Sequence, residues 1–570
     1  MAAGEHENVS PLVFRLHEGS PPVVREVLLE RGWEEYDEQE HEEGDWNLYW
    51  RTSAFRNSDY ENILPWQRMN HHPKTIHITR KDCLTRHLRR MKSAYGTSTY
   101  DFSPPAFILP NEYTTFLGVY TRNRTSGKSQ YWICKPVDLS RGRGIFLFDD
   151  IKDLAYDSPV IVQKYISDPL LISGYKFDLR IYVCVKSFSP LVIYMHQEGL
   201  VRFGTEKYSL ASLDNLYSHL TNTSINKFGL CYTAYKEQVG RGCKWTMSKF
   251  RCFLQNQGVN DLLLWNKISN IVTLTLLTAA PSSPSSPNCL ELLGFDILID
   301  TSFKPWLLEV NYSPALSLDC PADVTVKKGL INDIIDLMNY KMIDSFRHKG
   351  YLRTRYMRPC CLRHYLRPPA FLLHKTTGLN ESISSNSIRV CPRKETYNTT
   401  FPNTRATFSK RYEQTHSYHK QLVDVFLNDE EIDIEESDLT ALSQVRQTSR
   451  KLASTACKLP SLHVQNHKSA TAPSNRRSQD RCIPPFRVGD FILTFPFNEV
   501  TWKASRDEVD VKTVVHEVHK LTSRLASSFS DEERTKIDKP GAARDKFEAL
   551  LWGPKNPPLL SEVCAFSSKC

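Results

Sequence analysis

The sequence contains no CxxC pair, although it has 15 cysteines among its 570 residues. A zinc or redox site built on paired thiols therefore has little support, and we expect free thiols in a reducing compartment. The sequence also lacks an apolar run of the roughly 20 residues needed to cross a membrane, since the longest, at 268–280, is short and rich in threonine. The opening stretch, MAAGEHENVS, lacks the apolar segment of a secretory signal. These absences predict a soluble, cytoplasmic protein without a membrane partner.

Several motifs that identify nucleotide or metal sites are absent as well. Neither a Walker A sequence nor GxGxxG occurs. The 18 histidines show no metal-ligand spacing, and we interpret His71 and His72 as a surface pair. No internal repeat is found. Common motifs therefore do not classify this chain.

The charge balance is basic, because 73 Lys and Arg residues outnumber 64 Asp and Glu residues and give a formal net charge of +9. Such an excess favours an anionic partner, which could be nucleic acid, a membrane surface or an acidic protein tail. The sign alone does not choose among them. The length of the chain predicts several domains, at about 100–200 residues each.

The hydrophobic pattern predicts a mixture of helices and strands. We expect a strand followed by a helix within 12–33, and further helices at 79–94 and 323–343. Between them, residues 131–203 contain short runs rich in β-branched and aromatic residues, which are typical of strands. Residues 279–288, AAPSSPSSPN, have the composition of a flexible surface insertion.

One predicted strand, KFDLRIYV, alternates strictly between apolar and polar residues. Side chains repeat every two residues in a strand, so Lys176, Asp178, Arg180 and Tyr182 share one face and Phe177 lies on the other. A solvated outer face is the usual reason for such alternation. The alternative is that two cations and a carboxylate line a functional site.

A second pair of strands, GFDILID and PWLLEVN, favours the functional alternative. The short connection TSFK fits a hairpin, which would place Asp296, Glu309 and Asn311 on one face. Carboxylate and amide oxygens are hard ligands that suit Mg²⁺ when it also binds nucleotide phosphates. We therefore predict a magnesium site here.

Two further stretches fit a nucleotide. Lys135 ends the strand YWICK and could hold phosphates as a compact charge. In the following SRGRGI, Gly142 and Gly144 would let the backbone approach a phosphate closely. The stretch QKYI at 163–166 could present backbone groups to an adenine.

These stretches, in this order, resemble the tubulin tyrosine ligase-like family, and within it the polyglutamylases. The matching text is WICKP with SRGRGI, VQKYISDPLLISGYKFDLRIYV, GLVRFGTEKY, HLTNTSINK, and ELLGFDILID with PWLLEVNYSP, preceded by RKDCLTRHLRRM. The resemblance spans roughly 45–345. It implies an α/β (α+β) ATP-grasp fold, in which two α/β subdomains clamp ATP between antiparallel sheets.

The resemblance also implies roles for individual residues. The expected ATP-binding residues are Lys135, Arg141, Gly142, Gln163, Lys164, Tyr165, Ile166, Lys176, Phe177, Asp178, Thr221 and Asn222. Free L-glutamate would contact Arg202, Ser224 and Lys244, and Mg²⁺ would bind Asp296, Glu309 and Asn311. Arg141 and Arg180 would be catalytic. Removal of Arg202 would weaken glutamate binding and leave ATP binding nearly intact.

With this assignment the chain divides into successive regions. They are an N-terminal α/β region at 1–125, an ATP-grasp catalytic core at 126–345, a basic segment at 346–369, a disordered linker at 370–480, an ordered strand and helix at 481–530, and a tail at 531–570. Arginine is dense at 347–367, and this stretch could be a solvated linker or could attract acidic tails.

The expected reaction is ATP-dependent ligation of glutamate to the γ-carboxylate of glutamates in acidic tails of tubulin or microtubules, through an acylphosphate. Three alternatives stay open: a ligase that adds glycine or tyrosine, a non-catalytic basic scaffold on microtubules, and a nucleic-acid-binding protein, although no recognition fold is evident. Accessory subunits could be required. The expected location is the cytoplasm and cytoskeleton, including the basal body of a cilium or flagellum.

Overall fold

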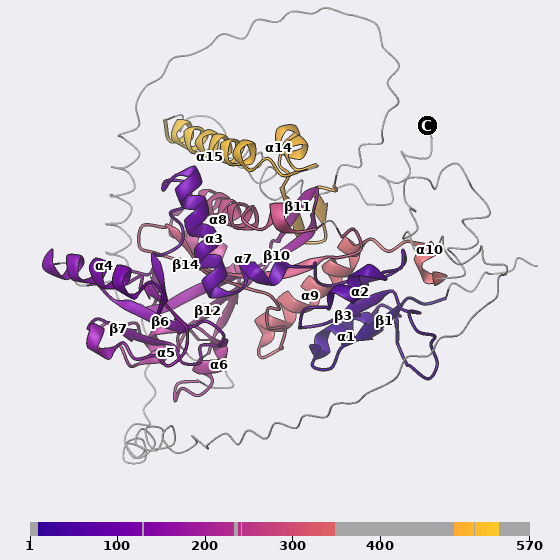
Figure 1. The fold of residues 1–570 in the computed structure, drawn as a ribbon, viewed down its shortest axis with the longest axis horizontal. Helices are drawn as coiled ribbons and strands as arrows, with labels where there is room; N and C mark the ends of the chain where they lie inside the picture. The colour runs from indigo at the N-terminus through magenta and orange to yellow at the C-terminus, as the bar shows by residue number, and fades with distance from the viewer. Residues whose placement is uncertain are drawn as a thin grey trace, which may run out of the picture. The chain divides into compact units, whose positions relative to one another are not determined.

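The computed structural model describes residues 10–127, 130–232, 238–240, 242–284, 286–347, 484–506 and 508–534 (Figure 1). These residues all belong to one compact unit. Most of the predicted basic segment, all of the predicted linker and most of the predicted tail lie outside the described residues.

A small parallel sheet begins the chain. It has the order β2-β1-β3-β4 and consists of β1 (Val13–Leu16), β2 (Glu34–Glu35), β3 (Leu48–Trp50) and β4 (Arg68–Met69). Helix α1 (Pro22–Glu30) starts at a proline, whose fixed φ suits the first helical turn. Its apolar face is buried in the same cluster as Phe14 of β1. The expected strand and helix within 12–33 are therefore confirmed.

A second, antiparallel sheet forms one wall of the later cavity. Its order is β5-β8-β6-β7, from β5 (Ala106–Leu109), β6 (Trp132–Pro136), β7 (Phe146–Phe148) and β8 (Val160–Lys164). Helix α4 (Tyr113–Thr125) covers it through Phe116 and Tyr120. Helix α3 (Lys81–Tyr95) precedes it, with Leu84, Leu88 and Met91 buried.

The largest sheet is built around the long strand β10 (Tyr175–Phe188). Its other strands are β9 (Leu171–Ile172), β11 (Leu191–His196), β12 (Leu200–Phe203), β13 (Lys244–Thr246), β14 (Glu291–Ile299) and β15 (Pro305–Asn311), together with two C-terminal strands. Strands β14 and β15 form the predicted antiparallel hairpin.

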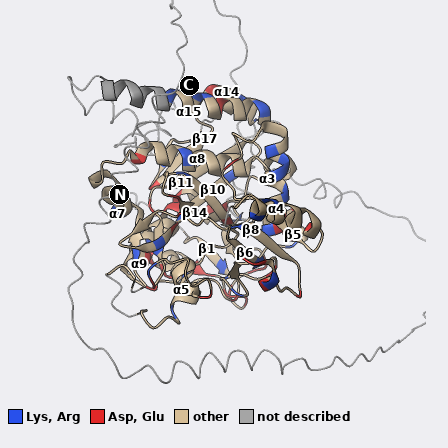
Figure 2. Cartoon of the chain, turned by 90° about the vertical axis from the view of Figure 1, so that its left-hand side faces the viewer, with Lys and Arg blue, Asp and Glu red and all other residues tan. Residues whose placement is uncertain are grey.

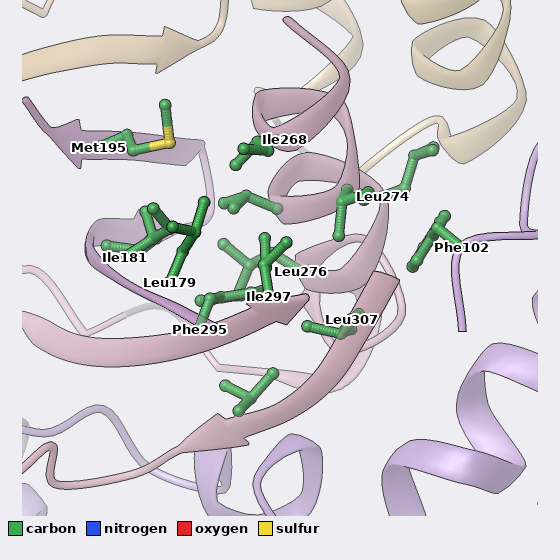
Figure 3. Packing of buried hydrophobic residues seen from close by; sticks show 14 of the residues in the cluster. Phe102, Leu179, Ile181, Met195, Ile268, Leu274, Leu276, Phe295, Ile297 and Leu307 are labelled. Atoms are coloured by element: carbon green, nitrogen blue, oxygen red, sulfur yellow. The ribbon is translucent and has the colours of Figure 1, made fainter. Parts of the chain in front are cut away.

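Helices cover both faces of this sheet. On one face, Leu179 and Ile181 of β10 and Phe295 of β14 pack with α7 (Met247–Asn256) and α8 (Asp261–Leu276) (Figure 3). On the other face, Tyr182 and Cys184 of β10 pack with α1 and α9 (Pro321–Met338). The sheet is therefore apolar on both sides near its centre, as a layer between helices must be.

The apolar run before the hairpin is a core helix. The stretch Asp261–Ser282 is long and apolar enough to cross a membrane, but 78% of its most apolar window is buried inside the structure. Part of the expected insertion at 279–288 is also buried, because Ala279, Ala280 and Ser283 pack inward around a 3-10 turn, η3 (Ala280–Ser282). The prediction of a fully exposed loop is wrong there.

A C-terminal segment completes the large sheet. Strand β17 (Phe491–Phe495) pairs with β11 and with β16 (Arg487–Val488), and helices α14 (Glu499–Ala504) and α15 (Val511–Arg534) follow. The strand and helix expected at 481–530 are confirmed, and a second helix, α14, lies between them. Strand β17 covers the edge of β11, whose backbone groups would otherwise lack strand partners on that side.

Removal of the β17 side chains should therefore destabilise the whole unit. Phe491 is fully buried and packs edge-on against His196 of β11, with ring centroids 4.9 Å apart. We expect Phe491→Ala to lower the free energy of unfolding by about 3–5 kcal/mol, measured by urea denaturation. Val500→Ala, at an exposed position of α14, should change it by less than about 0.5 kcal/mol. An unchanged main transition in Phe491→Ala would show that the segment folds independently.

Candidate active site

The alternating strand β10 is buried on both of its faces. Phe177 and the other apolar residues lie in the core, and Lys176, Asp178 and Arg180 are each less than 10% exposed. A solvated outer face is therefore excluded. Burial of this many charges is costly unless they pair with each other or with a ligand.

The polar face of β10 borders a cavity of about 310 Å³ between the two antiparallel sheets. Its walls come from β6, β8, β10, β14, β15 and the loop at 139–145. The predicted residues that line it are Lys135, Arg141, Gly142, Gln163, Lys164, Tyr165, Ile166, Lys176, Asp178, Thr221, Asn222, Asp296, Glu309 and Asn311. The strand order brings these distant residues together.

An ion-pair network forms the floor beside the cavity. Arg180 donates to Asp296 through Nε at 2.5 Å and Nη2 at 3.0 Å. Arg202 donates to Asp178 through Nε at 2.8 Å and Nη2 at 2.5 Å, and its Nη2 lies 2.8 Å from Asp296 Oδ2. Burial alone would raise the pKa of Asp296, but the two guanidinium groups outweigh it and hold that pKa below its usual range. Asp296 is therefore a charged carboxylate.

The hairpin places the expected metal ligands next to one another. Asp296 is the register partner of Glu309, and Asn311 donates to Asp296 at 3.3 Å and to Glu309 at 3.4 Å. Burial raises the pKa of Glu309, and the nearby Asp296 carboxylate adds to the rise. No ion pair joins Glu309 to a basic side chain among the residues that the structure describes. Two neighbouring carboxylates that repel each other, together with an amide oxygen, are suitable ligands for a divalent cation such as Mg²⁺.

Two lysines also line the cavity, of which Lys176 is buried and Lys135 is half-buried. Lys135 donates to Gln163 Oε1 at 2.8 Å, and Lys176 donates to Tyr165 Oη at 2.9 Å and to the His219 carbonyl at 2.8 Å. Burial lowers the pKa of Lys135 to about 8 and that of Lys176 to about 7. Both amines would gain from an anionic ligand, because a nearby negative charge favours their protonated form.

The loop at 140–144 turns sharply through three residues with positive φ. Arg141, Gly142 and Gly144 have φ values of 61°, 76° and 68°. Glycine adopts positive φ without steric cost, which explains why two of these three residues are glycines. The Ser224 hydroxyl donates to the Arg141 carbonyl at 3.0 Å and ties the loop to helix α6 (Thr223–Asn226). Ser224 therefore supports the loop, and it does not line a pocket in the described structure.

A smaller pocket adjoins the cavity at Thr221. Arg202 and Lys244 line it, and they are directly paired positions on β12 and β13. Lys244 donates to Asp323 at 2.7 Å and to Asp319 at 3.3 Å. Phe177 lies in the core and Arg180 in the ion-pair network, so neither lines the cavity.

Three contributions to the site were missed from sequence. Lys81 lines the cavity at the start of α3 and donates to the Leu139 carbonyl at 2.6 Å. Its position at the start of a basic helix was the one sequence feature that could have identified it. Tyr312 also lines the cavity, as does His219, whose carbonyl accepts from Lys176. No sequence pattern identifies either residue as part of the site.

The interpretation of His71 and His72 as a surface pair is wrong. Both are buried, and Glu291, which is fully buried, accepts from His71 Nδ1 at 2.6 Å and from the His72 amide at 2.8 Å. The His71 ring stacks on Tyr312, with centroids 4.1 Å apart. The prediction failed because the sequence around His71 and His72 does not show that Glu291, more than 200 residues away, would be buried against them.

Two antiparallel sheets around a cavity of lysines and carboxylates define an ATP-grasp ligase. The sequence profile described as the tubulin-tyrosine ligase family matches residues 57–348, about half of the chain. The chain belongs to this family.

Individual relatives agree with the profile. The chain is 45% identical over 534 residues to the probable tubulin polyglutamylase TTLL2 of Homo sapiens, covering 91% of this chain and 86% of that protein. Identity to the Mus musculus protein of the same name is 44%, covering 90% and 93%. Tubulin polyglutamylase TTLL5 of Mus musculus is 35% identical over 341 residues, covering 58% of this chain and 25% of that protein.

The lowered pKa of Lys135 predicts that nucleotide affinity depends on pH. With a pKa of about 8 in the free protein, Lys135 is mostly charged at pH 7.5 and mostly neutral at pH 9. A bound triphosphate would restore the charge, so affinity should fall by about eightfold between these values from Lys135 alone. Isothermal titration calorimetry in two buffers should show proton uptake at pH 9. Lys135→Arg, which stays charged at both values, should bind with a flatter profile, and an equal slope in both proteins would contradict the assignment.

Proposed function

We propose that this chain ligates L-glutamate to glutamate side chains in acidic protein tails, with tubulin as the substrate. The names of the relatives support tubulin and glutamate. The observation that carries the proposal is the pair Arg202 and Lys244, which places two buried cations in a small pocket beside the nucleotide cavity.

Amide formation from a carboxylate in water requires activation. Transfer of the γ-phosphoryl group of ATP to the tail carboxylate would give an acylphosphate and ADP. The amine of free glutamate then attacks the acyl carbon and phosphate leaves. No protein nucleophile is needed, because positioning and charge stabilisation supply the catalysis.

Each region of the cavity has a part in this scheme. Lys135, Lys176 and Arg141 would hold the triphosphate, and the backbone at 163–166 would receive the adenine. Asp296, Glu309 and Asn311 would hold Mg²⁺, which supplies charge neutralisation at the phosphates when bound. Arg180 would keep Asp296 ionised and oriented.

The charges around the second pocket, whose free volume is about 10 Å³, suit glutamate better than glycine or tyrosine. Arg202 uses Nε and Nη2 for Asp178 and Asp296, and among the described residues no acceptor bonds its Nη1. A side-chain carboxylate could accept from that group in a charge-assisted hydrogen bond. Glycine has no side chain for such a contact, and the phenol of tyrosine is neutral.

Location and partners follow from the same proposal. A tubulin-modifying ligase would act in the cytoplasm on the cytoskeleton, including the basal body of a cilium or flagellum. Activity could also require accessory subunits. The ligation assay is therefore run with and without cell extract, which would supply them.

Glu309→Gln should abolish ligation without unfolding the protein. The change keeps the volume and removes one charge from the metal site, and it also removes repulsion from Asp296. We expect a loss of at least about 100-fold in turnover. The assay incubates tubulin, Mg-ATP and labelled glutamate, glycine or tyrosine, and weighs the tails by mass spectrometry.

The matched control is Glu61→Gln, at an exposed position outside the cavity lining. It should retain wild-type turnover, and both variants should melt at or above the wild-type temperature. Near-normal turnover in Glu309→Gln would contradict the metal assignment. Incorporation of glycine or tyrosine by the wild type would contradict the choice of glutamate.

Lys244→Met should weaken glutamate binding and leave ATP binding unchanged. Asp323 keeps a second cation, Lys327, at 2.7 Å, so removal of Lys244 does not leave it unpaired. The KM for glutamate should rise by about tenfold or more. Arg202→Ala is a poorer probe than expected from sequence, because it would also remove the ion pair of Asp178 and leave Asp296 with Arg180 alone.

Initial rates at varied glutamate and varied ATP provide the measurement for Lys244→Met. Lys249→Met, at an exposed position on α7, is the control and should match the wild type. Parallel increases in both KM values would indicate a general distortion and would remove Lys244 from the amino-acid site.

A further inference from the structure

A turn beside the active site holds two apolar side chains in solvent. Phe228 is 73% exposed and Leu230 is 84% exposed, and these are the highest values for large apolar side chains within the described ranges. A single exposed apolar residue needs no explanation. Two such residues, one residue apart at the rim of a cavity, are a candidate contact surface.

The backbone of this turn is well hydrogen-bonded. The amide of Phe228 donates to the Ile225 carbonyl at 3.0 Å, that of Gly229 to Asn226 at 2.9 Å, and that of Tyr232 to Gly229 at 3.0 Å. A side chain at Gly229 would crowd Thr205 and Tyr217 at 3.1 Å. The turn therefore packs closely on the body of the protein while Phe228 and Leu230 stay outside.

The turn lies between the two pockets. On one side it continues from α6, whose Ser224 holds the phosphate-covering loop and whose Ile225 packs against Gly142. On the other side, Asn226 and Tyr232 line the small pocket that contains Arg202 and Lys244. A peptide that enters the reaction centre from this side would pass close to this turn.

Free positive charge is concentrated at the same rim. The Lys227 Nζ lies 5.0 Å from the centre of the Phe228 ring. Arg143 and Lys227 are exposed, and neither forms an ion pair with a described acidic residue. An anionic chain would therefore meet uncompensated cations here.

Helix α3 provides the contrast. Figure 2 shows basic residues along it, but Arg80 and Arg86 pair with Asp82, Arg89 with Glu112 and Lys92 with Asp101. These pairs reduce its attraction for an acidic ligand. The rim at 227–232 is the better site for one.

We propose that Lys227, Phe228 and Leu230 form a docking surface for the acidic tail of the protein substrate, and that this surface selects an apolar side chain next to the modified glutamate. The inference rests on the proposed function and adds the feature of the tail that the enzyme recognises. The cations attract the tail, and the exposed ring and leucine gain by burying an apolar neighbour.

Two fluorescent peptides of equal length and charge provide the test. One carries leucine beside the acceptor glutamate and the other carries serine. The wild-type full-length chain should bind the leucine peptide about tenfold more tightly, which corresponds to about 1.4 kcal/mol. The double variant Phe228→Ser, Leu230→Ser should lose this preference, with unchanged ATP affinity and melting temperature. Val500→Ser, an exposed apolar position on α14, should keep it.

The outcomes separate this inference from the proposed function. A preference that persists in the double variant, or is absent from the wild type, overturns the docking surface. Light scattering that shows a wild-type dimer and a monomeric double variant also overturns it, in favour of a second copy as the occupant. Peptide binding by fluorescence anisotropy does not require ligation, so failure of the wild type to incorporate any amino acid contradicts the proposed function alone.

Discussion

The site depends on a row of charges that crosses the central sheet. Lys244, Arg202 and Asp178 are successive register partners on β13, β12 and β10, and Arg180, Asp296 and Glu309 are successive partners on β10, β14 and β15. Buried charges are tolerated only when paired, and Arg202 connects the two halves by contacting both aspartates. Removal of Arg202 would leave Asp178 buried without an ion pair, which costs more than the pair itself contributes.

Because the two aspartates share Arg202, the proposed nucleotide, metal and amino-acid sites are not electrostatically independent. Asp296 is at once an acceptor for two arginines and a candidate metal ligand, while Glu309 forms no ion pair among the described residues and has a raised pKa, although Lys81 and Lys135 partly offset the rise. A divalent cation at the hairpin would offset the repulsion between the two carboxylates. Lys244 is the exception, because Asp323 and Lys327 give it a separate pairing.

The edge of the sheet that carries this row is covered by a C-terminal segment that is distant in sequence. Strand β17 covers β11, and α15 packs against α8, so residues after 484 share one core with residues 177–310. The Thr99 hydroxyl and His519 of α15 are 2.7 Å apart, which adds a polar contact to the apolar ones. Stability of the catalytic region and retention of the C-terminal segment are therefore linked.

The sequence by itself determined the elements and most of the cavity lining. Alternation in KFDLRIYV placed Lys176 and Asp178 on one face, and the short TSFK connection was enough to align Asp296 with Glu309, because both depend on local periodicity and turn length. Only the tertiary structure decided that this polar face is buried, that Arg202 joins Asp178 to Asp296, and that His71 meets Glu291. It also decided that β17 belongs to the core. Those contacts join residues that are distant in sequence, and strand order and register, which no local pattern encodes, bring them together.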